Sequence, residues 1–212
     1  MQTHHFPVAR MARYLTSSPV TSETCDLLVG LHGYGQLAKD LADALAPVSV
    51  SGRVLVCPEA LSHYYTNHRK RVVGASWMTS EDREYEIMDY VSYLDGLVEE
   101  VTTDAPDHMR LTVLGFSQGA STATRWIGNG QVPADRLILW GAPHAHDLTD
   151  EEWAVLKALP EIILVFGTED TVVPAPRMRD AESDLIAHGC TVRTHAYDGG
   201  HKILESVLKE IV

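Results

Sequence analysis

The chain has 212 residues, of which 45% are hydrophobic and 22% are charged, and its formal net charge is −12. This length and composition are typical of a globular protein and predict a single domain over residues 1–212. The negative charge argues against nucleic acid and anionic lipid as partners, because both attract basic surfaces. No segment has the roughly 18 apolar residues that stable insertion into a membrane requires.

The first residues and the cysteines indicate the cellular compartment of the protein. The opening segment, MQTHHFPVARMARYLTSS, lacks the apolar core of a secretory signal. The three cysteines, Cys25, Cys57 and Cys190, are widely spaced and odd in number, which predicts reduced thiols rather than a disulfide framework. We therefore expect a cytoplasmic protein.

Short apolar runs alternate with segments of helical spacing along the whole chain. The predicted strands cover residues 26–31, 53–57, 111–115, 136–140, 161–166 and 191–197, with one or two edge strands before residue 18. The clearest helix covers about residues 81–103, where apolar side chains recur every three or four positions, as in Ile87, Val91 and Leu94. This alternation predicts an α/β fold with a mostly parallel central sheet and helices on both faces.

The sequence GFSQG at residues 115–119 joins a predicted strand to a predicted helix. A Gly-x-Ser-x-Gly sequence at such a turn forms the nucleophile elbow of α/β-hydrolases. Gly115 and Gly119 would let neighbouring backbone pass closely, so that the turn holds the serine out of the sheet at the positive end of a helix. We therefore predict that Ser117 is a nucleophile.

A serine becomes reactive only when a base takes its proton and an acid orients that base. His201 follows two glycines at the last strand-to-helix junction, from which its side chain can reach back over the sheet. Asp170 follows the preceding strand and is preferred to its neighbour Glu169 as the orienting acid. The order Ser117, Asp170, His201 is the order of these groups in α/β-hydrolases.

The other titratable side chains in the second half of the chain are predicted to have no catalytic role. His144 and His146 could offer two nitrogens to a metal, but no third ligand has a suitable spacing, and a polar surface loop is the preferred interpretation. Asp147, Asp180 and Asp184 are expected to be solvated. No metal and no organic cofactor is predicted.

An ester-cleaving serine also needs backbone N–H groups that stabilise the oxyanion. One is predicted from Gln118, the residue after the nucleophile. The other is predicted from Tyr34 in the sequence HGYG, which follows the strand at residues 26–31 and has a glycine on each side of the tyrosine.

The sequences LHGYG, GFSQG, GTEDTVVP and GGH together resemble the phospholipase/carboxylesterase family of α/β-hydrolases, which includes small bacterial carboxylesterases and acyl-protein thioesterases. The resemblance covers nearly the whole chain. It implies the α/β-hydrolase fold, a catalytic triad of Ser117, Asp170 and His201, and an oxyanion hole formed by Tyr34 and Gln118.

The segment 58–79 is predicted to be a long loop that forms one wall of the substrate pocket, because long loops in compact domains tend to be functional. Tyr65, Trp77 and Met78 are its candidate substrate-binding residues, and the resemblance also implies that Trp77 and Met78 lie near the acyl site, although the family often has Phe where Met78 stands. The alternative is that segment 58–79 is a structural flap whose aromatic side chains pack on the sheet and do not contact the substrate. The basic run Arg69–Arg71 could steer an anionic substrate, although a solvated turn is favoured.

Together these features predict a serine carboxylesterase that acts on small-molecule carboxylic esters of modest size through an acyl-enzyme. An acyl thioesterase or lysophospholipase would use the same triad. A non-catalytic binding module is disfavoured, because it would not need all three groups. Only a few residues separate Trp140 from Thr149, so no cap domain is expected there. A homodimer is compatible with the sequence.

Overall fold

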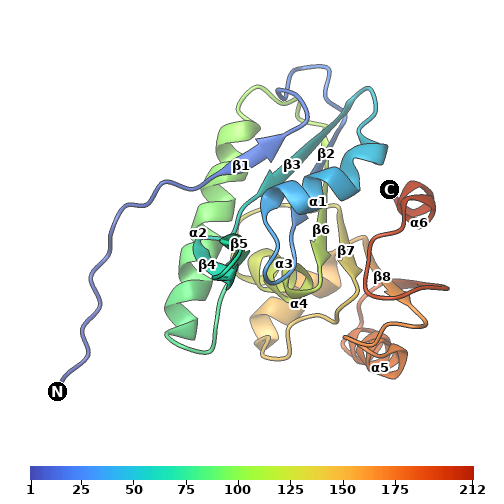
Figure 1. Cartoon of the computed structure of the whole chain (residues 1–212). Coiled ribbons are helices and arrows are strands. Elements are labelled where there is room, and N and C mark those ends of the chain that lie inside the picture. The colour runs from blue at the N-terminus through green and yellow to red at the C-terminus, as the bar shows by residue number, and fades with distance from the viewer.

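The computed structural model describes residues 1–212. Its elements in chain order are β1 (Tyr14–Thr16), β2 (Asp26–Leu31), α1 (Ala38–Leu45), the short 3₁₀ helix η1 (Ala46–Val48), β3 (Arg53–Pro58), β4 (Ser62–Asn67), β5 (Val72–Ser76), α2 (Arg83–Val101), β6 (Arg110–Phe116), α3 (Gln118–Asn129), β7 (Arg136–Trp140), α4 (Asp150–Ala158), β8 (Glu161–Gly167), α5 (Ala175–Ala187), β9 (Val192–Tyr197) and α6 (Glu205–Ile211). Seven strands form one sheet in the order β1-β3-β2-β6-β7-β8-β9 (Figure 1). Every neighbouring pair is parallel except β1 and β3.

Two apolar layers hold helices against the two faces of this sheet. Alternate residues of a strand point to opposite faces, so that Leu27 and Val29 of β2 pack in the layer under α2, α3, α4 and α5. Leu28, between them, packs in the layer under α1 and α6. The predicted mostly parallel sheet with helices on both faces is therefore confirmed. The connection between β7 and α4 covers only residues 141–149, and no cap is inserted there.

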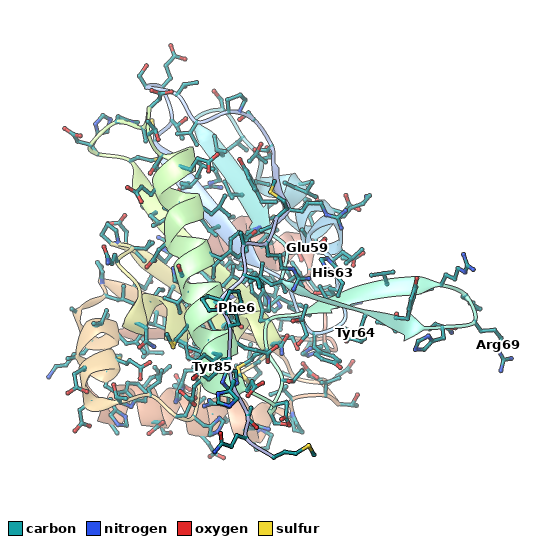
Figure 2. All side chains as sticks on the ribbon, turned by 90° about the vertical axis from the view of Figure 1, so that its left-hand side faces the viewer. Phe6, Glu59, His63, Tyr64, Arg69 and Tyr85 are labelled. Atoms are coloured by element: carbon teal, nitrogen blue, oxygen red, sulfur yellow. The ribbon has the colours of Figure 1, made fainter.

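The segment 58–79 differs from the predicted irregular loop, because β4 and β5 within it form a separate antiparallel hairpin. The hairpin projects from the body of the molecule, with Arg69 at its far end (Figure 2). Its outer half is exposed, so it lacks the alternation of apolar and polar residues by which a strand can be recognised. At its base, the Gly35 N–H donates to Ala75 O at 2.9 Å and the Ala75 N–H donates to Gln36 O at 3.0 Å.

The beginning of the chain contributes one edge strand to the sheet. β1 pairs antiparallel with β3 through Tyr14–Thr16, whereas residues 1–13 form no helix or strand. This segment runs along α2, where the ring of His5 stacks on that of Tyr85 with the ring centres 4.1 Å apart (Figure 2). None of the helices combines the length and the apolar character needed to cross a membrane.

Candidate active site

Ser117 occupies a strained turn between β6 and α3, with φ 53° and ψ −118°. A non-glycine residue rarely adopts a positive φ, and such strain persists only where the surrounding structure enforces it. A Cβ atom at Gly119 would lie 2.1 Å from Leu31 O, and one at Gly115 would lie 2.2 Å from Gly119 O. Both glycines are therefore required by the close approach of backbone around the serine.

Three strand ends bring Ser117, Asp170 and His201 into one continuous series of hydrogen bonds. His201 Nε2 lies 2.9 Å from Ser117 Oγ, and His201 Nδ1 lies 2.6 Å from Asp170 Oδ2. Asp170 in the ionised state only accepts hydrogen bonds, so it favours the tautomer with the proton on Nδ1. That tautomer leaves Nε2 able to accept the proton of a serine hydroxyl.

The carboxyl group of Asp170 is fully buried but well supplied with donors. Its Oδ1 accepts hydrogen bonds from the backbone N–H groups of Val172 at 2.8 Å and Val173 at 3.0 Å. Burial alone would raise the pKa of Asp170, but the hydrogen bonds from Val173, His201 and Val172 outweigh it and hold this pKa below its ordinary value. Asp170 therefore stays ionised, whereas the adjacent Glu169 is exposed to solvent.

Two backbone N–H groups beside Ser117 are suited to receive an oxyanion. The turn that carries Tyr34 lies against the nucleophile, since a Cβ at Gly33 would be 3.2 Å from Ser117 Cβ. The Tyr34 N–H makes no backbone hydrogen bond. Gln118 is the first residue of α3, and the N–H groups of the first helical turn have no partner within the helix.

The side chain of Gln118 ties the nucleophile turn to the segment 76–78. Its Oε1 accepts a hydrogen bond from the Trp77 backbone N–H at 3.1 Å, and its Nε2 donates to Met78 O at 2.9 Å. The Trp77 indole N–H donates in turn to His32 O at 2.8 Å, at the start of the HGYG turn. These bonds connect the two backbone segments that carry the free N–H groups.

The structure corrects the predicted substrate-binding role of Trp77, Met78 and Tyr65. Trp77 is only 2% exposed and packs in the core. Met78 is half-buried, with its sulfur 3.5 Å from Arg125 Nη1, and Tyr65 lies on the hairpin with its ring 5.3 Å from that of His68. None of the three lines the cavity next to Ser117.

We expect Trp77→Ala to lower the free energy of unfolding rather than to change which ester is preferred. Removing a buried indole leaves a cavity and typically costs about 3–5 kcal/mol, and here the hydrogen bond to His32 O is lost as well. Urea denaturation measures this loss, with Tyr65→Ala at an exposed ring as the matched control. Normal stability of Trp77→Ala together with a changed ranking of esters would contradict the buried position.

A cavity of about 480 Å³ opens beside Ser117, between α3, α5 and the connection from β7 to α4. Its wall includes Gln118, Ser121, His144, Arg177 and Asp180. The sequence analysis did not name Ser121 or Arg177, and it assigned no place in a substrate cavity to His144 or Asp180. One sequence pattern could have identified part of this wall: Arg177, Asp180 and Asp184 share one face of α5. That face is polar, however, and resembles an ordinary solvated helix surface.

The connection from β7 to α4 is more buried than the predicted polar loop, and two of its residues form pairs. His144 is 8% exposed and its Nε2 lies 2.9 Å from Asp184 Oδ2. Burial lowers the pKa of His144, although Asp184 opposes this effect. Asp147 binds Arg125 and Arg83, and although burial acts in the opposite direction, these hydrogen bonds lower the pKa of Asp147 to about 2. Asp147 and Asp184 are thus paired rather than merely solvated.

No group of three or more His, Cys, Asp or Glu side chains is arranged to hold a metal ion.

Comparison with known proteins identifies the family of the chain. The model of the phospholipase/carboxylesterase family matches residues 18–212. The search of curated proteins found no match. Among solved structures, acyl-protein thioesterase 2 of Zea mays superposes with a TM-score of 0.70 at 19% identity, covering 95% of this chain and 98% of that one.

Two esterases give similar superpositions. The carboxylesterase of Bacillus cereus is 14% identical with a TM-score of 0.68, over 94% of this chain and 91% of that one. Esterase PE8 is 25% identical with a TM-score of 0.62, over 95% of this chain and 98% of that one. The chain has the α/β-hydrolase fold and belongs to the phospholipase/carboxylesterase family of hydrolases.

Proposed function

We propose that the protein is a serine carboxylesterase that hydrolyses carboxylic esters of modest size through an acyl-enzyme. In this proposal Ser117 is the nucleophile, His201 the general base and acid, and Asp170 the group that orients His201. The observation that carries the proposal is the unbroken series of hydrogen bonds from buried Asp170 through His201 to the strained Ser117.

In the first half of the reaction, Ser117 Oγ attacks the ester carbonyl carbon while its proton moves to His201 Nε2. The carbonyl oxygen becomes an oxyanion and accepts hydrogen bonds from the N–H groups of Tyr34 and Gln118. Each such donor lowers the barrier by roughly 3 kcal/mol. The intermediate collapses, the bond to the alcohol oxygen breaks, and His201 returns the proton to the departing alcohol.

Water then repeats the sequence on the acyl-enzyme. His201 takes a proton from the water as its oxygen attacks the acyl carbon, and the same two N–H groups hold the new oxyanion. Cleavage of the bond to Ser117 Oγ releases the carboxylic acid, and Ser117 recovers its proton from His201. The ionised Asp170 stabilises the imidazolium in both halves.

A fluorophosphonate probe tests the proposal, because it reacts only with an activated serine. We expect labelling of the wild-type protein at Ser117 and none in Ser117→Ala. Ser121→Ala is the matched control, since Ser121 lies one turn along α3 and lines the same cavity. Labelling at another serine, or an unlabelled wild-type protein, would count against the assignment.

A further inference from the structure

The Tyr34 N–H, one of the two proposed oxyanion donors, belongs to the peptide that joins Gly33 to Tyr34. This peptide lies against the nucleophile turn, since a Cβ at Gly33 would be 3.2 Å from Ser117 Cβ. The chain has no cis peptide bond, and the C=O and N–H groups of a trans peptide point in opposite directions. The groups that hold Gly33 O therefore also set the direction of the Tyr34 N–H.

Gln36 holds both polar groups of Gly33. Its side-chain Oε1 accepts a hydrogen bond from the Gly33 N–H at 2.8 Å, and its backbone N–H donates to Gly33 O at 3.2 Å. The second bond closes a turn over residues 33–36, in which Gly35 has the positive φ of 76° that favours glycine. The side chain of Gln36 thus braces the turn that carries Tyr34.

His32 supplies a second donor to Gly33 O. Its Nδ1 lies 2.8 Å from Gly33 O, and its Nε2 lies 3.1 Å from the backbone nitrogen of Ala60. The Ala60 N–H can only donate, so Nε2 carries the lone pair and Nδ1 carries the proton that is donated to Gly33 O. The ring is fully buried, and burial lowers the pKa of His32 although the hydrogen bond to Gly33 acts in the opposite direction. The ring is therefore neutral, with a fixed tautomer.

The two donors on Gly33 O affect the Tyr34 N–H in two ways. They occupy both lone pairs of the carbonyl oxygen, so the peptide cannot rotate without breaking them. They also polarise the peptide, and hydrogen bonds in series strengthen one another. The Tyr34 N–H itself has no backbone acceptor that would hold it. Its direction thus depends on the hydrogen bonds made to Gly33.

We propose that His32 and Gln36 are positioning residues that direct the Tyr34 N–H at the oxyanion. The inference rests on the proposed function, and both side chains act on the reaction through the Gly33–Tyr34 peptide. Removal of a whole oxyanion donor lowers kcat roughly 10²–10³-fold, and a donor that is present but misdirected should cost less. We therefore expect the loss of either side-chain bond to Gly33 to lower kcat roughly tenfold to a hundredfold. KM should change by less than about twofold, because the bond to the oxyanion forms only in the transition state.

Two amides at position 32 separate the bond to Gly33 O from the bond to Ala60. In His32→Asn the amide nitrogen takes the place of Nδ1 and can donate to Gly33 O, but the side chain is too short to reach the Ala60 N–H. In His32→Gln the amide lies one carbon further out, where its oxygen can accept from the Ala60 N–H. With p-nitrophenyl butanoate we expect His32→Asn to keep kcat within roughly threefold of the wild-type value and His32→Gln to show the full loss. Equal kcat values in the two variants would overturn the role of His32.

Gln36→Met tests the other side chain, and it does so even if the variants at the buried His32 fail to fold. Gln36 is half-buried on a turn, and methionine removes Oε1 at nearly constant size. Gln131→Met is the matched control, because Gln131 is exposed after the end of α3. We expect kcat to fall in Gln36→Met at unchanged KM, and Gln131→Met to keep the wild-type values of both.

Inhibition by an alkyl trifluoromethyl ketone distinguishes positioning from a merely structural role. Ser117 Oγ adds to the ketone carbon while its proton moves to His201, and the ketone oxygen becomes an oxyanion like that of the ester. The inhibition constant should therefore rise in Gln36→Met and His32→Gln by the factor by which kcat falls.

An inhibition constant and a kcat that stay at the wild-type values in Gln36→Met would overturn the role of Gln36. In that case, as in the case of equal variants at position 32, the wild-type protein would still show Ser117-dependent hydrolysis. Failure of the proposed function would instead leave no Ser117-dependent hydrolysis of p-nitrophenyl butanoate by the wild-type protein.

Discussion

The Ser117→Ala and His201→Ala enzymes are each expected to lose roughly four to six orders of magnitude in kcat on p-nitrophenyl butanoate. The double variant should be no slower than either single variant. The physical reason is that Ser117 Oγ attacks only when His201 Nε2, 2.9 Å away, takes its proton, so losing either group abolishes the same step. Steady-state kinetics with a spontaneous-hydrolysis blank measures the effect.

His188→Ala serves as the control for the histidine variant, since His188 is exposed at the end of α5. It should retain wild-type kcat. If instead the effects of Ser117→Ala and His201→Ala multiplied in the double variant, the two groups would be acting independently. The proposed proton transfer between them would then be untenable.

Asp170→Asn is expected to lower kcat by roughly 10⁴-fold while leaving the fold intact. An amide in place of the carboxylate can donate to His201 Nδ1, which favours the tautomer with the proton on Nε2. That proton would point at Ser117 Oγ, 2.9 Å away, and the histidine could no longer accept the serine proton. Rate measurements on p-nitrophenyl butanoate, with circular dichroism to verify folding, give the result.

The neighbouring Glu169 provides a matched comparison, because it is acidic, adjacent and exposed. Glu169→Gln should behave as the wild-type enzyme. The opposite pattern, with Asp170→Asn active and Glu169→Gln inactive, would mean that the orienting acid has been misidentified.

The central sheet and the nucleophile turn could be predicted from sequence because their signals are local. Strands covered on both faces, such as β6 and β8, are nearly continuous apolar runs, and their lengths in the structure agree with the prediction to within about one residue at each end. The close contacts of Gly115 and Gly119 restrict the turn so strongly that the motif identifies it. Asp170 and His201 could be placed because each directly follows a strand.

The walls around Ser117 could not be predicted, because they depend on packing between distant segments. Trp77 is large and lies near a family motif, which suggested a substrate contact, but its indole N–H finds a partner in His32, 45 positions away. Arg177 and Asp180 look like ordinary surface charges in the sequence. Only the position of α5 beside α3 shows that they border the cavity.

The two ends of the β4–β5 hairpin are subject to unequal constraints on sequence change. At the base, a Cβ atom on Gly74 would lie 2.2 Å from Gly35 O, next to the turn that carries Tyr34. At the far end, the residues around Arg69 are exposed and touch no other element of the fold (Figure 2). Insertions and deletions at the far end are therefore compatible with an intact Tyr34 turn, whereas the base must keep its glycine. Among related hydrolases, this hairpin is free to diverge in length and charge at its far end without any change at the nucleophile.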